Sequence, residues 1–220
     1  MKLVLMTQPT FFVEEDKILS SLFEAGLDDL HLFKPGSSPM YSERLLTLLP
    51  DEYRKRITVH DNYYLKEEFK LRGIHIDDET TPAPNGYKGH ISRSCSHLDL
   101  LKDTKKHADY VLLKYIFDSQ TEPDRKATFT LEQLQEASRR GLIDRHVYAL
   151  GGMNLDTIKA VRDLGFGGIV ISGDLWNRFN IHQELEYQAL IDHFCKIRKA
   201  LSSDSGELTV SAARTRRFSL

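Results

Sequence analysis

Short apolar runs alternate with helical patterns along the chain, and this alternation is the feature that most limits how it can fold. Residues 111–113 and 169–171 are apolar throughout, which is typical of parallel strands that are covered on both faces. Such strands need a helix or loop between them to return the chain to the same end of the sheet. Eight strands are predicted, over residues 2–6, 29–33, 56–60, 73–77, 89–94, 110–117, 147–150 and 168–172.

Helical patterns occupy the spaces between several of these runs. Residues 14–25 place an apolar stripe on one face and are followed by a glycine, which commonly ends a helix. Thr130 and Asn154 are favourable N-cap residues for helices over 131–140 and 155–164. The order of elements is therefore strand, helix, strand along most of the chain.

Eight strands that alternate with helices predict an α/β fold, specifically a (β/α)₈ TIM barrel. The segment 77–88 is rich in acidic residues, Thr, Pro and Gly, and it contains no apolar period long enough for a helix. We therefore expect a loop in place of the fourth helix. A doubly wound open sheet of six or seven strands is the structural alternative.

The chain has 220 residues, a length that suits one such barrel. A strong helical pattern over 183–201 predicts the last helix, and the apolar periodicity stops after it. We therefore expect a single barrel domain over 1–201 and a C-terminal tail over 202–220.

The composition excludes several classes of protein. Apolar residues make up 40% of the chain and charged residues 28%, which excludes a disordered or collagen-like polypeptide. The net charge of −2 argues against a protein that mainly coats nucleic acid or an anionic membrane. Cys95 and Cys195 form no CxxC pair, and no run approaches the roughly 20 apolar residues of a membrane span. We expect a cytoplasmic protein with no nucleic-acid or membrane partner.

Two glycine-containing segments follow the seventh and eighth predicted strands. Gly151 and Gly152 precede a predicted helix, and Ser172 and Gly173 come one strand later. Glycine lets a backbone approach an anion closely, and barrels often bind phosphate in these two loops. We interpret the pair as a phosphate site, although both segments could simply be tight turns.

The carboxylates at the strand ends are candidates for a metal site. Asp61 follows the third strand, and an acidic run over 77–79 follows the fourth. Mg²⁺ prefers carboxylate oxygens, but an Asp that caps a helix and a solvated acidic loop would look the same. A zinc site is not expected, because the nine His residues are scattered without HxxxH or HExxH spacing.

Five sequence blocks together resemble the thiamine phosphate synthase family and its relatives, the TenI-type thiazole tautomerases. The resemblance spans roughly residues 1–178, and the spacing of the blocks is more specific than any one of them. The blocks are LHLFK at 30–34, VHD at 59–61, GIHI at 73–76, SCSH at 94–97 with DYV at 109–111, and ALGGM at 149–153 with ISG at 171–173.

The resemblance implies a (β/α)₈ barrel that joins hydroxymethylpyrimidine diphosphate to thiazole phosphate, with Mg²⁺ assisting the departure of pyrophosphate. Gly151, Gly152, Ser172 and Gly173 match the site of the thiazole phosphate. Asp61 matches a metal-binding aspartate, so that Mg²⁺ is the expected cofactor.

The remaining roles that the resemblance implies concern the reacting ends and the pyrophosphate. Ser94 matches a serine near the reacting ends of the substrates, and Lys34 stands in for a basic residue that grips pyrophosphate. Glu79 is the metal-ligand candidate beside Thr80, where the family has its second metal-binding aspartate. His60 occupies a position that is usually Asn.

The sequence departs from the family where pyrophosphate is bound. His31 replaces the first residue of a Gln-x-Arg-x-x-Lys pattern, and the family's later lysine is absent unless Arg125 or Lys126 replaces it. Lys34, His31 and Lys126 are therefore the predicted pyrophosphate-binding residues. Tyr115 occupies the place near which the tautomerases use a catalytic His.

Three functions follow from this pattern. The first is a synthase of thiamine phosphate, with Ser94, His60 and Tyr115 as the catalytic candidates. The second is a metal-independent tautomerase in which His60, His31 or Tyr115 moves the proton. The third is a protein that binds thiazole or thiamine phosphate without catalysis. The expected partners are small phosphorylated molecules, and a homodimer is one assembly to test.

Overall fold

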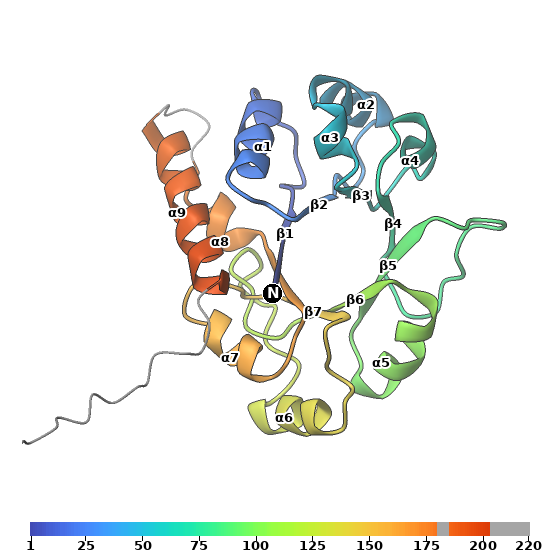
Figure 1. Ribbon diagram of the computed structural model, residues 1–220, viewed down its shortest axis with the longest axis vertical. Helices are drawn as coiled ribbons and strands as arrows, with labels where there is room; N and C mark the ends of the chain where they lie inside the picture. The colour runs from blue at the N-terminus through green and yellow to red at the C-terminus, as the bar shows by residue number, and fades with distance from the viewer. Residues whose placement is uncertain (180–184, 203–220) are drawn as a thin grey trace, which may run out of the picture.

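The computed structural model describes residues 1–179 and 185–202, and its eight strands form a closed parallel barrel (Figure 1). Each strand pairs with the next along the chain, and the first pairs with the last, from Lys2 opposite Gly168 to Leu5 opposite Ile171. The predicted TIM barrel is confirmed, and the open sheet is excluded. The strands are β1 (Lys2–Met6), β2 (Asp29–Leu32), β3 (Ile57–Val59), β4 (Gly73–Ile76), β5 (His90–Cys95), β6 (Tyr110–Leu113), β7 (Val147–Leu150) and β8 (Gly168–Ile171).

Helices surround the barrel on all sides except between β4 and β5, where Figure 1 shows a long loop. The described chain has no helix between those two strands, as the composition of 77–88 predicts. The helices are α1 (Glu15–Glu24), α2 (Pro39–Leu48), α3 (Asp51–Arg54), α4 (Tyr64–Glu68), α5 (Leu98–Thr104), α6 (Leu131–Arg139), α7 (Ile158–Asp163), α8 (Gly173–Trp176) and α9 (Leu185–Ser202), with a 3₁₀ turn, η1, at Lys105–His107.

Two predicted boundaries differ from the structure by three residues or more. The sixth strand ends at Leu113 rather than at residue 117, because Tyr115 has a φ of +62° and so leaves the extended conformation. The helix expected from residue 155 begins at Ile158. The Asn154 side chain accepts hydrogen bonds from the backbone N–H groups of Asp156 and Thr157, which closes a turn where the helix was predicted to begin.

Other helix ends follow their sequence signals. Thr130 and Gln133 form a capping box at the start of α6, with each side chain bonded to the other's backbone N–H. The helix predicted over 183–201 is α9, and its first predicted residues lie outside the described chain. Ser202 belongs to α9, and the rest of the predicted tail also lies outside the described residues.

Hydrophobic side chains pack both outside and inside the barrel wall. The larger core lies between the strands and the helices, and it includes Leu22, Phe194 and Ile197. A smaller cluster within the barrel contains Val4, Leu112 and other residues of β1, β6, β7 and β8. No helix among the described residues is both long enough and apolar enough to span a membrane.

The interior is polar on the side of β2 to β5. Alternate residues of these strands carry polar side chains that are buried inside the barrel. The polar interior residues are His31 on β2, Thr58 on β3 and His60 just after it, His75 on β4, and Ser92 and Ser94 on β5.

Candidate functional site

A cavity of about 350 Å³ opens where the strands end, at the face of a TIM barrel that carries function. Its lining comes from the loops after β6, β7 and β8 and from residues at the ends of β1, β2, β3 and β4. The volume lies in the range of small-molecule sites. Six of the predicted site residues line it: His60, Tyr115, Gly151, Gly152, Ser172 and Gly173.

The two glycine turns are required by close backbone contacts. Gly151 and Gly152 have φ angles of +109° and +63°, a conformation that strains other residues. A Cβ atom on Gly152 would lie 2.4 Å from the carbonyl oxygen of Asp118, and one on Gly173 would lie 2.8 Å from Thr121 Cγ2. The loop after β6 therefore packs directly against both turns.

These turns present backbone donors to the cavity. Within the described chain, the N–H groups of Gly152, Met153 and Gly173 donate no hydrogen bond, and all three residues line the cavity. Unpaired N–H groups gathered in two adjacent loops are suited to bind the oxygens of a phosphate.

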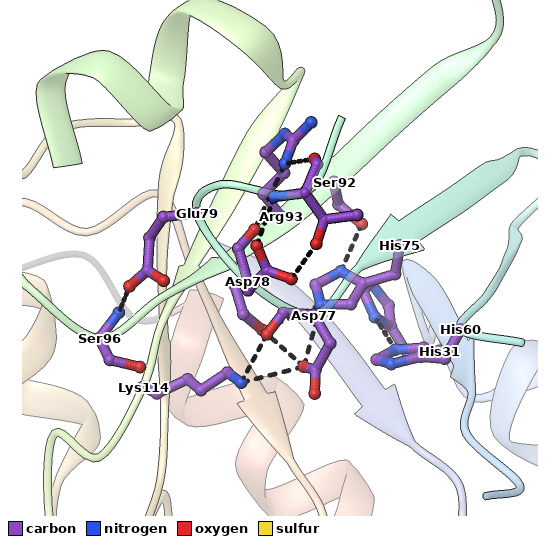
Figure 2. Close-up of polar contacts among 12 residues, drawn as sticks. His31, His60, His75, Asp77, Asp78, Glu79, Ser92, Arg93, Ser96 and Lys114 are labelled. Atoms are coloured by element: carbon purple, nitrogen blue, oxygen red, sulfur yellow. Dashed lines mark hydrogen bonds and ion pairs between the residues drawn. The ribbon is translucent and has the colours of Figure 1, made fainter. Parts of the chain in front are cut away.

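Two cations line the same cavity. Lys114 Nζ lies 3.0 Å from Asp77 Oδ1 and 2.9 Å from the Asp77 carbonyl oxygen, which holds the ammonium in place (Figure 2). The Arg125 guanidinium lies 4.7 Å from the centre of the Tyr115 ring and 3.6 Å from Glu122 Oε2. Since both cations border the cavity that contains the glycine turns, it is suited to a ligand with more than one anionic group.

Asp77 is held ionised at the rim of the cavity. Burial raises the pKa of its carboxyl, but the neighbouring His75 imidazole and Lys114 ammonium outweigh burial, so its pKa lies below the usual range. Ser94 Oγ donates a hydrogen bond to Asp77 Oδ1 at 3.1 Å, and it also contacts His75 Nε2 at 2.9 Å. Ser94 does not line the cavity, but it is hydrogen-bonded to Asp77, which does.

The three residues predicted to bind pyrophosphate are not among the lining residues. Lys34 is buried and donates to both oxygens of Glu15, at 2.6 and 2.9 Å. Burial raises the pKa of the Glu15 carboxyl to about 7, although Lys34 opposes this. Lys126 is exposed and pairs with Asp118 at 3.1 Å. His31 lies inside the barrel, below the cavity-lining His60.

The two predicted metal ligands are also not among the lining residues. Asp61 is exposed and directly follows His60, and no hydrogen bond or ion pair engages its carboxylate in the described chain. Glu79 accepts a hydrogen bond from the backbone N–H of Ser96 and lies 3.3 Å from His97 Nδ1. Asp61 is therefore free to ligate Mg²⁺, whereas Glu79 already has partners.

Three histidines from adjacent strands meet inside the barrel (Figure 2). His31 Nδ1 lies 2.8 Å from His60 Nε2, and the rings of His60 and His75 stack with their centres 4.2 Å apart. Burial, together with the neighbouring imidazoles, holds the pKa of His31 and of His60 well below the usual value. Burial also lowers the pKa of His75, while Asp77 opposes the shift. All three imidazoles are therefore neutral near pH 7.

Several site residues escape recognition in the sequence. Lys114 belongs to no motif, the sequence indicates Asp77 only as part of the acidic run over 77–79, and it indicates Arg125 only as a substitute for the family's absent lysine. Position hides Lys114 as well, because the sequence places it inside the strand predicted over 110–117, whereas the structure ends that strand at Leu113. The histidine cluster matches no short metal-binding motif, because its members lie on or directly after three separate strands.

Known proteins that are similar to this chain indicate the family to which it belongs. A family model described as thiamine monophosphate synthase matches residues 43–175. The thiamine-phosphate synthase of Limosilactobacillus reuteri is 23% identical over 133 residues, which are 57% of this chain and 61% of that protein. The one from Caldivirga maquilingensis is 35% identical over 133 residues, or 58% and 63% of the two chains. Each match thus spans about three fifths of the relative's length.

Two solved structures have the same fold over most of this chain. The crystal structure of thiamine phosphate pyrophosphorylase from Bacteroides thetaiotaomicron has a TM-score of 0.81 and 48% identity, covering 91% of this chain and 97% of its own. Thiamine phosphate pyrophosphorylase from Pyrococcus furiosus has a TM-score of 0.67 and 22% identity, covering 91% and 95%, and supports the fold alone. The family match over more than half of the residues and the 48% identical structure confirm the resemblance: this chain belongs to the thiamine monophosphate synthase family.

Proposed function

We propose that this protein is a thiamine phosphate synthase, which joins a hydroxymethylpyrimidine diphosphate to a thiazole phosphate and releases pyrophosphate. The observation that carries the proposal is one cavity that contains two glycine turns with free N–H groups and two cations, Lys114 and Arg125. The reaction needs both features, because one substrate is a phosphate monoester and the other loses a diphosphate. The 48% identical thiamine phosphate pyrophosphorylase supports this choice of substrates.

The glycine turns are the proposed site of the thiazole phosphate. The N–H groups of Gly152, Met153 and Gly173 would donate to its oxygens, and Ser172, directly before Gly173, also lines the cavity. No side chain can replace the hydrogen on Gly152 without meeting the Asp118 carbonyl. The backbone therefore fixes the position of the thiazole ring relative to the rest of the cavity.

The cations are the proposed site of the diphosphate. The bond between the pyrimidine methylene carbon and the diphosphate oxygen breaks, and the thiazole nitrogen forms the new bond to that carbon. Lys114 and Arg125 would stabilise the negative charge that develops on the departing oxygen, each by a few kcal/mol. Asp77 contributes by holding the Lys114 ammonium at a fixed position. Asp61 would hold Mg²⁺, which would supply further charge compensation for the diphosphate when bound.

The test is steady-state turnover of both substrates with Mg²⁺ by the wild type and two lysine variants. Lys114→Met removes the cavity cation, and we expect kcat/KM to fall by about 100-fold or more. Lys126→Met is the matched control, because Lys126 pairs with Asp118 and does not line the cavity. Its kcat/KM should stay within about twofold. If kcat/KM fell equally in the two variants, Lys114 would not have the proposed role in binding the diphosphate.

A metal-independent tautomerase is the second candidate, and His60 favours it. This imidazole lines the cavity, is neutral, and has a buried Nδ1 atom with no hydrogen-bond partner, so that it could accept a proton. Conversion of a thiazole carboxylate phosphate without Mg²⁺ or pyrimidine diphosphate would favour this function over the synthase. Binding of thiazole phosphate with neither activity would favour a non-catalytic binding protein.

A further inference from the structure

The histidine cluster inside the barrel has the composition of a metal site that is separate from any Mg²⁺ site. His31, His60 and His75 come from the ends of β2, β3 and β4, and one nitrogen of each lies within 4.8 Å of the other two. The exposed fraction of the whole residue is 0% for His31, 9% for His60 and 1% for His75. Three buried imidazoles therefore present three neutral nitrogen donors to one small volume.

Each ring has one nitrogen that now contacts another histidine of the cluster or Ser94, and that would exchange this contact for an ion. Tyr110 OH contacts His31 Nε2 at 2.5 Å, and Ser92 Oγ contacts His75 Nδ1 at 2.8 Å. These contacts orient two of the rings from outside, as the outer partners of metal-binding histidines do. His31 Nδ1, His60 Nε2 and His75 Nε2 are then the donors. His75 Nε2 would exchange its contact with Ser94 for the ion, and Ser94 would keep Asp77.

One polar atom of the cluster lacks any partner. His60 Nδ1 is buried and makes no hydrogen bond, which is uncommon for a buried polar group. His60 also lines the cavity, so that the cluster borders the cavity at this residue. An ion on the three nitrogens could therefore be reached from the cavity and could keep a fourth position for water or substrate.

The geometry is close to that of a tetrahedral site but not identical to it. Zinc–nitrogen bonds of about 2.0–2.1 Å in a tetrahedral set separate the nitrogens by about 3.3 Å. The His31–His60 pair, now 2.8 Å apart, would open by about half an ångström, and the third nitrogen would close in from at most 4.8 Å. Small ring rotations achieve this, because all three rings end on flexible χ2 torsions.

The ligand type selects the ion. Neutral imidazoles suit Zn²⁺, Co²⁺, Ni²⁺ and Cu²⁺, whereas Mg²⁺ requires oxygen ligands. The cluster contains no carboxylate among its three donors. We propose that His31, His60 and His75 form a binding site for one divalent transition-metal ion of the zinc class, with an open position toward the cavity. This site is independent of the proposed synthase activity.

The experiment titrates Co²⁺ into the tag-free full chain after chelator treatment and records the visible absorption spectrum. We expect saturation at one ion per chain, with the intense visible bands of four-coordinate Co²⁺ and no thiolate charge-transfer band. Zn²⁺ should displace the Co²⁺, and a large excess of Mg²⁺ should not. Wild-type chain that gives no visible band, or a thiolate band from Cys95 or Cys195, would overturn the proposal.

Variants assign the ligands. His31→Gln and His75→Gln should each weaken Co²⁺ binding by at least about 100-fold. A loss of this size exceeds the roughly 10- to 100-fold loss that is typical when only a hydrogen-bond partner of a metal ligand is removed. His97→Gln is the matched control, because His97 is exposed and outside the cluster, and its affinity should not change. The far-UV circular dichroism spectrum checks that each variant is folded. If His31→Gln or His75→Gln does not fold, His60→Gln replaces it in the Co²⁺ titration. Wild-type affinity in folded cluster variants would overturn the assignment.

Discussion

Acidification should destabilise this protein through the buried histidines, and a single substitution isolates the effect. The pKa of His31 lies well below its ordinary value because burial disfavours the charged imidazole. A group whose pKa is lowered on folding contributes stability above its unfolded pKa, and that contribution is lost as the pH falls below it. The loss for His31 should therefore begin near pH 6.5, the approximate pKa of an unfolded histidine.

The loss of stability follows from the number of protons that the unfolded chain binds and the folded chain does not. At pH 5.5, an imidazole that remains neutral when folded lowers the free energy of unfolding by about 1.4 kcal/mol relative to neutral pH. His31 and His60 together should lower it by about 3 kcal/mol, a large part of the stability of an ordinary domain. Glu15 acts in the opposite direction, since its raised pKa of about 7 adds stability as the pH falls toward 4.5.

Comparison of two chains cancels the contribution of Glu15. His31→Gln cannot be protonated at this position, so between pH 6.5 and pH 5.5 its free energy of unfolding should fall by about 1 kcal/mol less than that of the wild type. Urea unfolding monitored by fluorescence measures this, because Trp176 is the single tryptophan and is buried. His97→Gln, which changes an exposed side chain, should follow the wild-type curve. Parallel curves for His31→Gln and the wild type would refute the reasoning.

Three further substitutions have definite expected outcomes. Gly152→Ala places a Cβ atom 2.4 Å from a backbone carbonyl, so we expect a loss of about 1–3 kcal/mol in urea unfolding and weaker thiazole phosphate binding by calorimetry. Thr130→Ala breaks the capping box of α6 and should cost about 1 kcal/mol, with turnover unchanged. Lys34→Met leaves Glu15 buried alone and should cost about 3–5 kcal/mol at pH 8. The double variant Lys34→Met with Glu15→Leu should recover much of that loss, and no recovery would show that the pair is not coupled.

Local sequence patterns predict most of the barrel. The alternation of short strand patterns with helical patterns identifies all eight strands, although only some of them, such as β6 and β8, are apolar throughout. The missing fourth helix is equally readable from the composition of 77–88. The boundaries of the elements are less predictable. Tyr115 adopts a left-handed backbone conformation that the apolar run before it does not indicate. The turn formed by the Asn154 side chain lies where α7 was expected to begin.

The site is predictable only where its chemistry lies within one loop. The glycine turns can be found because closely spaced residues form them. Lys34 shows the limit, since its burial against Glu15 depends on how α1 packs on the barrel. A signal for the histidine cluster does exist in the strand alternation. His31 and His75 occupy strand positions that face the barrel axis, where most barrels have branched apolar residues.

The most direct test of the proposed activity is ³¹P NMR of the full chain with thiazole phosphate, hydroxymethylpyrimidine diphosphate and Mg²⁺. The proposal predicts that the thiazole phosphate resonance is replaced by that of thiamine phosphate, with one pyrophosphate released per product formed. A folded protein that binds thiazole phosphate by calorimetry but leaves both substrates unchanged would contradict it.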